Sequence, residues 1–166
     1  MMRILRRFAA AAVLILGVGA GHAGSLNIVA VGASNTSGWG VGAEAAFPAR
    51  LQTILRQRGI DATITNAGIF ADTTAGMLSR IDSAVPDGTN IVILQPGTND
   101  LRFGGSKDQR AANISAIVDR LRRRQIRVIV YDPVIPRNFL QWDGIHFTAE
   151  AHGTIAMTLA AQITGE

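Results

Sequence analysis

Two residues near the end of the chain have the types and spacing of an acid and base pair. Asp143 and His146 are three residues apart, and Gly144 lies between them. A glycine permits a short turn that brings the carboxylate to the imidazole. A carboxylate that accepts a hydrogen bond from one ring nitrogen fixes the tautomer and leaves the other nitrogen free to take a proton from a hydroxyl. This spacing therefore predicts a general base that activates a hydroxyl group.

Ser34 offers such a hydroxyl, in the stretch GASNTSGWG at residues 32–40. The stretch follows the apolar run LNIVAV and precedes an amphipathic segment, so it lies where a strand gives way to a helix. Gly32 permits a tight turn and a close approach by other groups. These features predict a serine nucleophile for acyl transfer.

Acyl transfer also requires hydrogen-bond donors directed at the oxyanion of the tetrahedral intermediate. Three groups are candidates: the backbone N–H of Ser34, the backbone N–H of Gly68 in NAGIFADTT, and the side-chain amide of Asn99 in GTND. Each stretch alone is weak evidence, because Asn, Gly, Thr and Asp are ordinary turn residues. Since each follows a predicted strand, together they predict an oxyanion hole.

The segments that must position these residues alternate between β-branched runs and stretches with helical spacing of apolar residues. We expect strands at 26–31, 62–65, 91–94 and 127–131, and helices around 47–55, 77–81, 114–121 and after Thr148. Strands without polar alternation, separated by helices, are typical of a parallel sheet covered on both faces. We therefore predict an α/β fold, a three-layer α/β/α sandwich with about four to five parallel strands in flavodoxin-like order. Its site would lie beyond the carboxyl ends of the strands.

With these residues the chain resembles the SGNH or GDSL hydrolases, a family of serine esterases, lipases, thioesterases and carbohydrate deacetylases. The resemblance extends from about residue 27 to the final predicted helix. It implies a nucleophile, Ser34; an acid and base, Asp143 and His146; and oxyanion donors at Ser34, Gly68 and Asn99. It implies no cofactor.

The resemblance leads us to expect cleavage of carboxylic esters with short acyl or aryl groups, and of thioesters or lysophospholipids. An alternative is removal of acetyl groups from cell-envelope or plant glycans. An alternative of another class is a catalytically silent protein that binds a glycan or peptide. Four aromatic residues in or beside the active loops could line a substrate pocket or cap the core: Trp39, Phe70, Phe103 and Trp142.

The chain departs from the family pattern in two places. The usual Gly-Asp-Ser opening is Gly-Ala-Ser here, with Ala33 in place of the aspartate. That aspartate is not the triad acid, so we expect the chemistry to survive. The link between the last predicted strand and Asp143 is short, and the prolines in residues 132–141 predict an extended segment and a sheet without an additional edge strand.

The first 23 residues have the pattern of a secretory signal peptide. Three arginines precede an apolar run at residues 8–20, and Gly21, His22 and Ala23 form a small-residue exit. The run is shorter than the roughly 20 apolar residues of a membrane-spanning helix. We therefore expect cleavage, a single SGNH domain at 24–166, a periplasmic or secreted location and no stable membrane anchor.

Charge gives no indication of a nucleic-acid partner. Residues 1–23 hold 3 of the 16 basic residues and none of the 12 acidic ones, which leaves 13 basic residues against 12 acidic ones. A basic cluster at residues 120–127 lies at the end of a predicted helix, where cations complement the helix dipole. We expect a small-molecule or glycan ester as the partner.

Other readings of the same residues are less well supported. Gly38, Gly40 and Ala43 fit G-x-G-x-x-A, but a dinucleotide site requires those glycines directly after the strand. A metal site is not predicted, because His146 and scattered acids form no convincing ligand set. We expect His152 to be an exposed or half-packed residue of the last helix.

Overall fold

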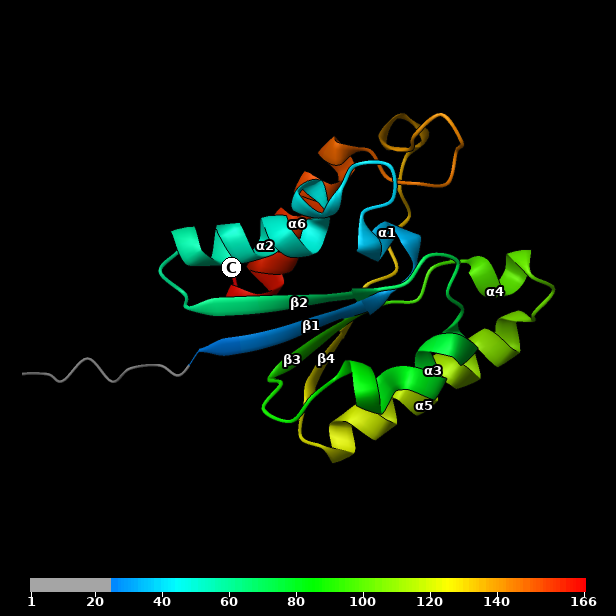
Figure 1. Ribbon diagram of the computed structural model, residues 1–166, viewed down its shortest axis with the longest axis horizontal. Coiled ribbons are helices and arrows are strands. Elements are labelled where there is room, and N and C mark those ends of the chain that lie inside the picture. Colours follow the sequence, from blue (N-terminus) through cyan, green and yellow to red (C-terminus); the bar gives the residue numbers. More distant parts are fainter. Residues whose placement is uncertain (1–24) are drawn as a thin grey trace, which may run out of the picture.

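The computed structural model describes residues 25–166, which form one parallel β-sheet between two layers of helices (Figure 1). The signal-peptide prediction for residues 1–23 lies outside the described residues. The strands are β1 (Leu26–Gly32), β2 (Ala62–Gly68), β3 (Ile91–Gln95) and β4 (Arg127–Val130). Their order across the sheet is β2-β1-β3-β4. The predicted α/β sandwich and flavodoxin-like order are confirmed, with four strands in the described part of the chain.

The register brings the strand ends that precede the candidate site to one edge. β1 pairs with both neighbours in parallel, so Gly32 at its end lies opposite Gly68 of β2 and Gln95 of β3. β4 extends the sheet through parallel pairing with β3. Because all four strands run in the same direction, the loops that follow them gather at this edge.

Helices connect the strands, and short helical turns follow β1 and β3. The α-helices are α1 (Ser34–Ser37), α2 (Phe47–Gln57), α3 (Thr74–Ala84), α4 (Asn99–Arg102), α5 (Lys107–Arg123) and α6 (Ala149–Thr164). The 3₁₀ turns are η1 (Ala43–Ala45) and η2 (Arg137–Phe139). In Figure 1, α2 and α6 cover one face of the sheet, and α3 and α5 cover the other. Within residues 25–166, no helix is long and apolar enough to cross a membrane.

Side-chain caps fix where three of the longer helices begin. Thr73 accepts a hydrogen bond from the Gly76 N–H before α3, and Ser106 accepts one before α5. Thr148 accepts one from the Ala151 N–H before α6, which confirms the predicted start of the last helix. A hydroxyl at this position satisfies an N–H that has no partner within its own helix.

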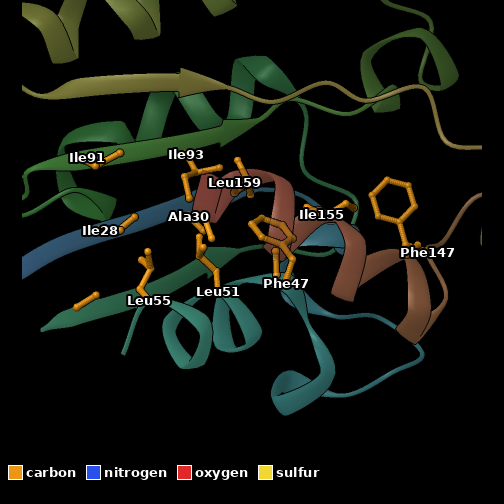
Figure 2. Close-up of a cluster of buried hydrophobic side chains, with 14 residues drawn as sticks. Ile28, Ala30, Phe47, Leu51, Leu55, Ile91, Ile93, Phe147, Ile155 and Leu159 are labelled. Atoms are coloured by element: carbon orange, nitrogen blue, oxygen red, sulfur yellow. The ribbon is translucent and has the colours of Figure 1, made fainter. Parts of the chain in front are cut away.

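Two apolar cores lie on opposite faces of the sheet. Successive residues of β1 alternate between them, since strand side chains point to opposite faces in turn. Ile28 and Ala30 face α2 and α6, where they pack with Phe47 and Leu159 (Figure 2). Val29 and Val31 pack on the other face against α3 and α5. The candidate site is therefore mounted on a sheet that is held from both sides.

His152 lies in the first of these cores, and the expectation that it is exposed or half-packed is wrong. Its side chain is fully buried, and its Nδ1 accepts a hydrogen bond from the Phe47 N–H at 3.2 Å. Its ring packs near Phe47 and Phe147, with centroids 6.3 and 5.8 Å away. His152 continues the buried stripe of α6 that includes Ile155 and Leu159, and helical spacing places these residues on one face.

The link from β4 to Asp143 is only partly extended. It contains η2, and beyond it Leu140 forms an isolated antiparallel bridge with Phe147. The bridge folds the segment 140–147 back on itself, and the Gln141 N–H donates to the His146 carbonyl at 2.7 Å. A compact hairpin, rather than another strand of the sheet, therefore carries Asp143 and His146.

Candidate active site

Ser34 is the first residue of α1 and lies just past the end of the central strand β1. A Cβ on Gly32 would lie 2.0 Å from the Thr36 Oγ1 and 2.8 Å from the Gln95 carbonyl oxygen. Only a glycine lets α1 pack so closely against β1 and β3. Below this turn the Thr36 hydroxyl donates to the Gln95 Oε1 at 2.7 Å. The backbone that presents Ser34 is thus fixed from beneath.

Ser34, His146 and Asp143 form a continuous hydrogen-bonded chain. The His146 Nε2 lies 3.0 Å from the Ser34 Oγ, although 112 residues separate the two in sequence. The His146 Nδ1 lies 2.5 Å from the Asp143 Oδ2. Gly144, at a φ of 68°, makes the turn between acid and base, a conformation that favours glycine. The structure thus brings these three side chains together, as the sequence predicted.

Hydrogen bonds from its own turn hold the Asp143 carboxylate in its ionised form. The His146 backbone N–H and the Ile145 N–H donate to its Oδ1 at 3.0 and 2.9 Å, while the His146 ring faces Oδ2. The backbone bond from His146, then the ring bond, then the Ile145 bond lower the pKa of Asp143 from its usual value to about 2. The carboxylate is therefore available to orient the imidazole and to stabilise its protonated form.

Asn35, which the sequence analysis did not single out, joins the serine turn to the histidine hairpin. Its side-chain Oδ1 accepts from the Phe147 N–H at 2.9 Å, and its Nδ2 donates to the Ile145 carbonyl at 3.3 Å. These two bonds bracket His146 from the residue next to Ser34. The amide next to the nucleophile in GASNTSGWG was the only sequence signal for this role. The sequence alone did not indicate which groups the amide would bind.

Gly68 does not have the geometry predicted for an oxyanion donor. Its N–H donates to the Asn66 side chain at 3.0 Å. A Cβ at this position would lie 2.3 Å from the Ser37 nitrogen, so the absence of a side chain makes room for α1 instead of a substrate. This prediction is corrected: Gly68 serves the close packing of β2 against α1.

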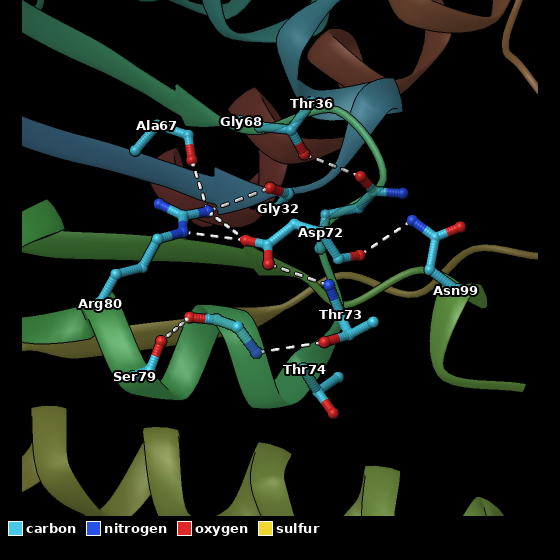
Figure 3. A network of polar contacts seen from close by, with 12 residues as sticks. Gly32, Thr36, Ala67, Gly68, Asp72, Thr73, Thr74, Ser79, Arg80 and Asn99 are labelled. Carbon is cyan, nitrogen blue, oxygen red and sulfur yellow. Dashed lines mark hydrogen bonds and ion pairs between the residues drawn. The ribbon is translucent and has the colours of Figure 1, made fainter. Parts of the chain in front are cut away.

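The loop that follows Gly68 presents another backbone donor. Ala71 is a non-glycine residue at a positive φ of 59°, a conformation that is uncommon outside glycine and often occurs at functional sites. Among the residues described, the Ala71 N–H has no hydrogen-bond partner. The next residue, Asp72, accepts the Asn99 side-chain amide at its carbonyl oxygen, at 2.8 Å (Figure 3). Ala71 therefore lies beside Asn99, and one N–H of the Asn99 amide remains for a ligand.

Arg80 holds this loop against the ends of two strands (Figure 3). Its guanidinium is paired with the Asp72 carboxylate through Nε and Nη2, at 2.9 and 2.8 Å. Nη2 also donates to the carbonyl oxygens of Gly32 and Ala67, at 3.2 and 2.9 Å. Charge-assisted bonds of this kind are stronger than neutral ones. The ion pair fixes the loop backbone relative to the turn that carries Ser34.

The aspartate of GTND fixes the same loop from the other side. Asp100 is buried, and its carboxylate accepts the Thr74 hydroxyl at 2.6 Å and the Thr74 N–H at 3.1 Å. Asn113 of α5 donates to the Thr74 hydroxyl at 3.0 Å. Asn99 and the loop after β2 are therefore held in one buried network.

Beside Ser34 is a cavity of about 440 Å³, lined on one side by the loops after β3 and β4. Ser34, Asn99 and Gly97 contribute to its wall, as do Pro133 and Ile135. Of the four predicted aromatic contacts, Trp39 and Phe70 lie near His146, with ring centroids 5.9 and 6.4 Å from the imidazole. The other two are exposed on the surface and are not part of the cavity lining: Phe103 at 62% and Trp142 at 96%. Within residues 25–166 no three His, Asp or Glu side chains group in a way that could hold a metal ion.

Curated esterases are similar to most of this sequence. The arylesterase of Vibrio mimicus is 25% identical over 128 residues, which cover 76% of this chain and 64% of that protein. Esterase TesA of Pseudomonas aeruginosa is 26% identical over 119 residues, which cover 71% of this chain and 59% of that protein. The chain thus spans less than two thirds of the length of either curated relative.

A solved structure and a family profile extend the likeness. AlinE4, described as an SGNH-hydrolase family esterase, is 31% identical, with a TM-score of 0.61 and coverage of 85% of this chain and 73% of that chain. Residues 30–162 match the GDSL-like lipase/acylhydrolase family. That range runs from β1, before Ser34, into α6, beyond His146, so it contains the whole of the site. The chain belongs to the GDSL-like lipase/acylhydrolase family.

Proposed function

We propose that this protein is a serine hydrolase that cleaves carboxylic esters through an acyl-enzyme. The observation that carries the proposal is the hydrogen-bonded chain from the Ser34 Oγ through the His146 ring to the Asp143 carboxylate, with separations of 3.0 and 2.5 Å. This arrangement suits a hydroxyl nucleophile, a general base and a group that orients the base. Membership of an acylhydrolase family and the names of the relatives support the same reaction class.

In the proposed first step, the Ser34 oxygen attacks the ester carbonyl carbon while the His146 Nε2 takes the hydroxyl proton. The bond from the carbonyl carbon to the leaving oxygen then breaks, and the imidazolium returns the proton to that oxygen. Water enters by the same route, with His146 again as base, and releases the acid. Asp143 stays ionised throughout, because its pKa of about 2 lies far below neutral pH.

Three donors are proposed for the oxyanion: the N–H of Ser34, the N–H of Ala71 and the free N–H of the Asn99 amide. Ala71 takes the place that the sequence analysis gave to Gly68, whose N–H is directed to Asn66. The Arg80 and Asp72 pair holds the Ala71 backbone, so the donor is positioned before substrate arrives. Preorganised donors of this kind are a major source of rate enhancement in acyl transfer.

The cavity beside Ser34 supports esters with small to medium acyl groups. Its volume of about 440 Å³ is in the range of small-molecule sites, and Ile135, Leu140 and Phe147 give part of the wall an apolar character. Short acyl esters are the proposed substrates, with thioesters as a related class. The pattern of residues 1–23 supports action outside the cytoplasm after signal cleavage.

A Ser34→Ala variant tests the proposal directly. Hydrolysis of a short activated ester should fall by at least about a thousandfold, and labelling by a fluorophosphonate should disappear. Ser83→Ala is the matched control, because Ser83 is an exposed serine near the last residue of α3, at the other end of that helix from the loop that carries Ala71. Equal turnover in Ser34→Ala and wild type, with folding confirmed by circular dichroism, would overturn the assignment.

A further inference from the structure

The strand order separates two sides of Ser34. Ser34 follows β1, which lies between β2 and β3 in the sheet. The loops after β3 and β4, on one side, build much of the cavity wall. The loop after β2, on the other side, carries Phe70, and Trp39 follows the serine turn itself. Trp39 and Phe70 do not line the cavity, so the nucleophile has a hollow on one side and an aromatic surface on the other.

Trp39 and Phe70 form a paired aromatic surface that reaches the imidazole. Their ring centroids are 4.4 Å apart, and the planes are tilted by 40°. Both remain about half exposed, at 49% and 55%, whereas His146 is only 9% exposed. Large exposed apolar side chains that cluster beside a functional group are a mark of a binding surface. We name this pair the aromatic platform.

The backbone of the platform is fixed on both sides. The Trp39 N–H donates to the Ser34 carbonyl at 3.0 Å, and the Trp39 carbonyl accepts the Gln141 side-chain amide at 2.9 Å. Phe70 lies inside a turn that begins with the Ile69 N–H on the Gly32 carbonyl, at 3.1 Å, and closes with the Asp72 N–H on the Ile69 carbonyl, at 3.2 Å. A ligand that packs on the platform therefore meets rings whose backbones are already ordered, which lowers the entropic cost of binding.

The proton transfers of the proposed reaction decide which part of an ester meets these rings. When the tetrahedral intermediate collapses, the bond to the leaving oxygen breaks and the His146 Nε2 gives that oxygen the proton taken from Ser34. The leaving oxygen must therefore lie within hydrogen-bonding reach of His146, next to which the platform lies. The acyl group, bonded to the same carbon, can then occupy the cavity beside Ser34.

On this basis we propose that Trp39 and Phe70 bind the leaving group of the substrate, and that this group is an aromatic alcohol. The inference rests on the proposed serine-hydrolase function. Flat rings gain from offset or edge contacts with aromatic side chains. The Gln141 amide next to the platform already donates to two carbonyl oxygens, of Trp39 and of Phe147 at 2.8 Å, so its N–H groups are not available for sugar hydroxyls.

The test compares three acetate esters: benzyl acetate, cyclohexylmethyl acetate and methyl acetate. Benzyl acetate and cyclohexylmethyl acetate have the same acyl group and similar leaving alcohols, but only the first has an aromatic ring. In Trp39→Ala and Phe70→Ala, kcat/KM for benzyl acetate should fall about three- to tenfold, the value of one aromatic contact. It should fall less for cyclohexylmethyl acetate and stay unchanged for methyl acetate. Trp39→Phe and Phe70→Tyr, which keep a ring, should recover most of the loss.

Controls separate binding of the leaving group from other roles. Phe103→Ala and Trp142→Ala remove exposed aromatic side chains outside the platform and should leave all three esters unchanged. Deacylation of the acetyl-enzyme should proceed at the wild-type rate in the platform variants, because the leaving group has already departed. The pH profile of kcat/KM should also keep its shape, as expected if His146 itself is unaltered.

Three results would overturn the proposal. An equal loss for benzyl and methyl acetate would show that the platform positions His146. A changed dependence on acyl length, measured with benzyl acetate and benzyl butyrate, would make the platform an acyl subsite. Unchanged kinetics for all esters would leave the rings without a role in binding. Each differs from failure of the hydrolase proposal itself, in which Ser34→Ala would retain activity on every ester.

Discussion

His146 and His152 are six residues apart, and the structure puts them in opposite settings. His146 lies in the hairpin at the sheet edge, and both ring nitrogens face side chains, Asp143 and Ser34. His152 lies in the core between α6 and α2, where Nδ1 accepts a backbone N–H. Its buried Nε2 has no hydrogen-bond partner within residues 25–166.

The difference shows how surroundings assign a role to the same side chain. The Asp143 carboxylate at one nitrogen orients the His146 ring, and the Ser34 hydroxyl lies at the other nitrogen. Around His152, burial and the positive charge of Arg50 lower the pKa to about 4, so the ring stays neutral near pH 7. His146 is therefore placed to exchange a proton with Ser34, whereas His152 stays in its neutral form.

The largest effect should come from His146→Ala. Loss of the base and proton donor should lower kcat/KM for a short activated ester by about a thousandfold or more. The melting temperature should change little, because His146 lies in the hairpin 140–147 at the edge of the sheet, and its truncation leaves the backbone bonds of that hairpin in place. Steady-state kinetics and thermal unfolding monitored by circular dichroism measure the two quantities. Retained activity in a folded variant would mean that His146, like His152, has no catalytic role.

His152→Ala should have a smaller effect, and it should lower stability and not catalysis. Removal of a fully buried ring between Phe47 and Phe147 leaves a cavity, which typically costs a few kcal/mol of unfolding free energy. Loss of the unpartnered Nε2–H offsets part of this cost, and loss of the acceptor for the Phe47 N–H adds to it, so we expect a decrease of about 2 kcal/mol. Urea unfolding measures it, and kcat/KM at 25 °C should remain close to wild type. A large loss of activity without a loss of stability would place His152 in the catalytic machinery.

The order of the strands and helices, and the edge of the sheet where His146 lies, could be predicted from the pattern of apolar residues in the sequence. Alternating strands and helices indicate the order of elements, and the carboxyl ends of parallel strands share an edge. The sequence pattern therefore places Ser34 near the pair formed by Asp143 and His146. Their separation of 112 residues was no obstacle, because topology closes it.

The direction of single groups depends on local backbone angles and could not be read in this way. Gly68 was expected to donate to an oxyanion, yet its N–H turns to Asn66, while the positive φ falls on Ala71. His152 was expected to be exposed or half-packed, because it lies inside the last predicted helix and Glu150 is its only nearby acid. Its neighbours on the helix face, Ile155 and Leu159, were the signal for burial.

The finest distinction between the two histidines is the pH dependence of stability. The pKa of His152 is lowered from 6.5 in the unfolded chain to about 4 in the folded protein, so between these values the unfolded chain binds more protons. Unfolding free energy should therefore fall as the pH decreases from about 6.5 to about 4, by at most about 1.4 kcal/mol per pH unit from this residue. Asp143, with a pKa of about 2 in the folded protein, remains ionised there across that window and adds little to the slope in its upper part.

His152→Gln isolates the contribution, since glutamine does not titrate. Urea unfolding of wild type, His152→Gln and His146→Ala at several pH values between about 4 and 7.5 gives three slopes. The slope should shrink in His152→Gln and persist in His146→Ala, because other titrating groups are common to all three proteins. Equal slopes in wild type and His152→Gln would mean that the buried ring accepts a proton in the folded state as readily as in the unfolded chain. The core would then have to supply a partner for the second proton, and Arg50, the charged group whose field acts on His152, is a cation that can only oppose it.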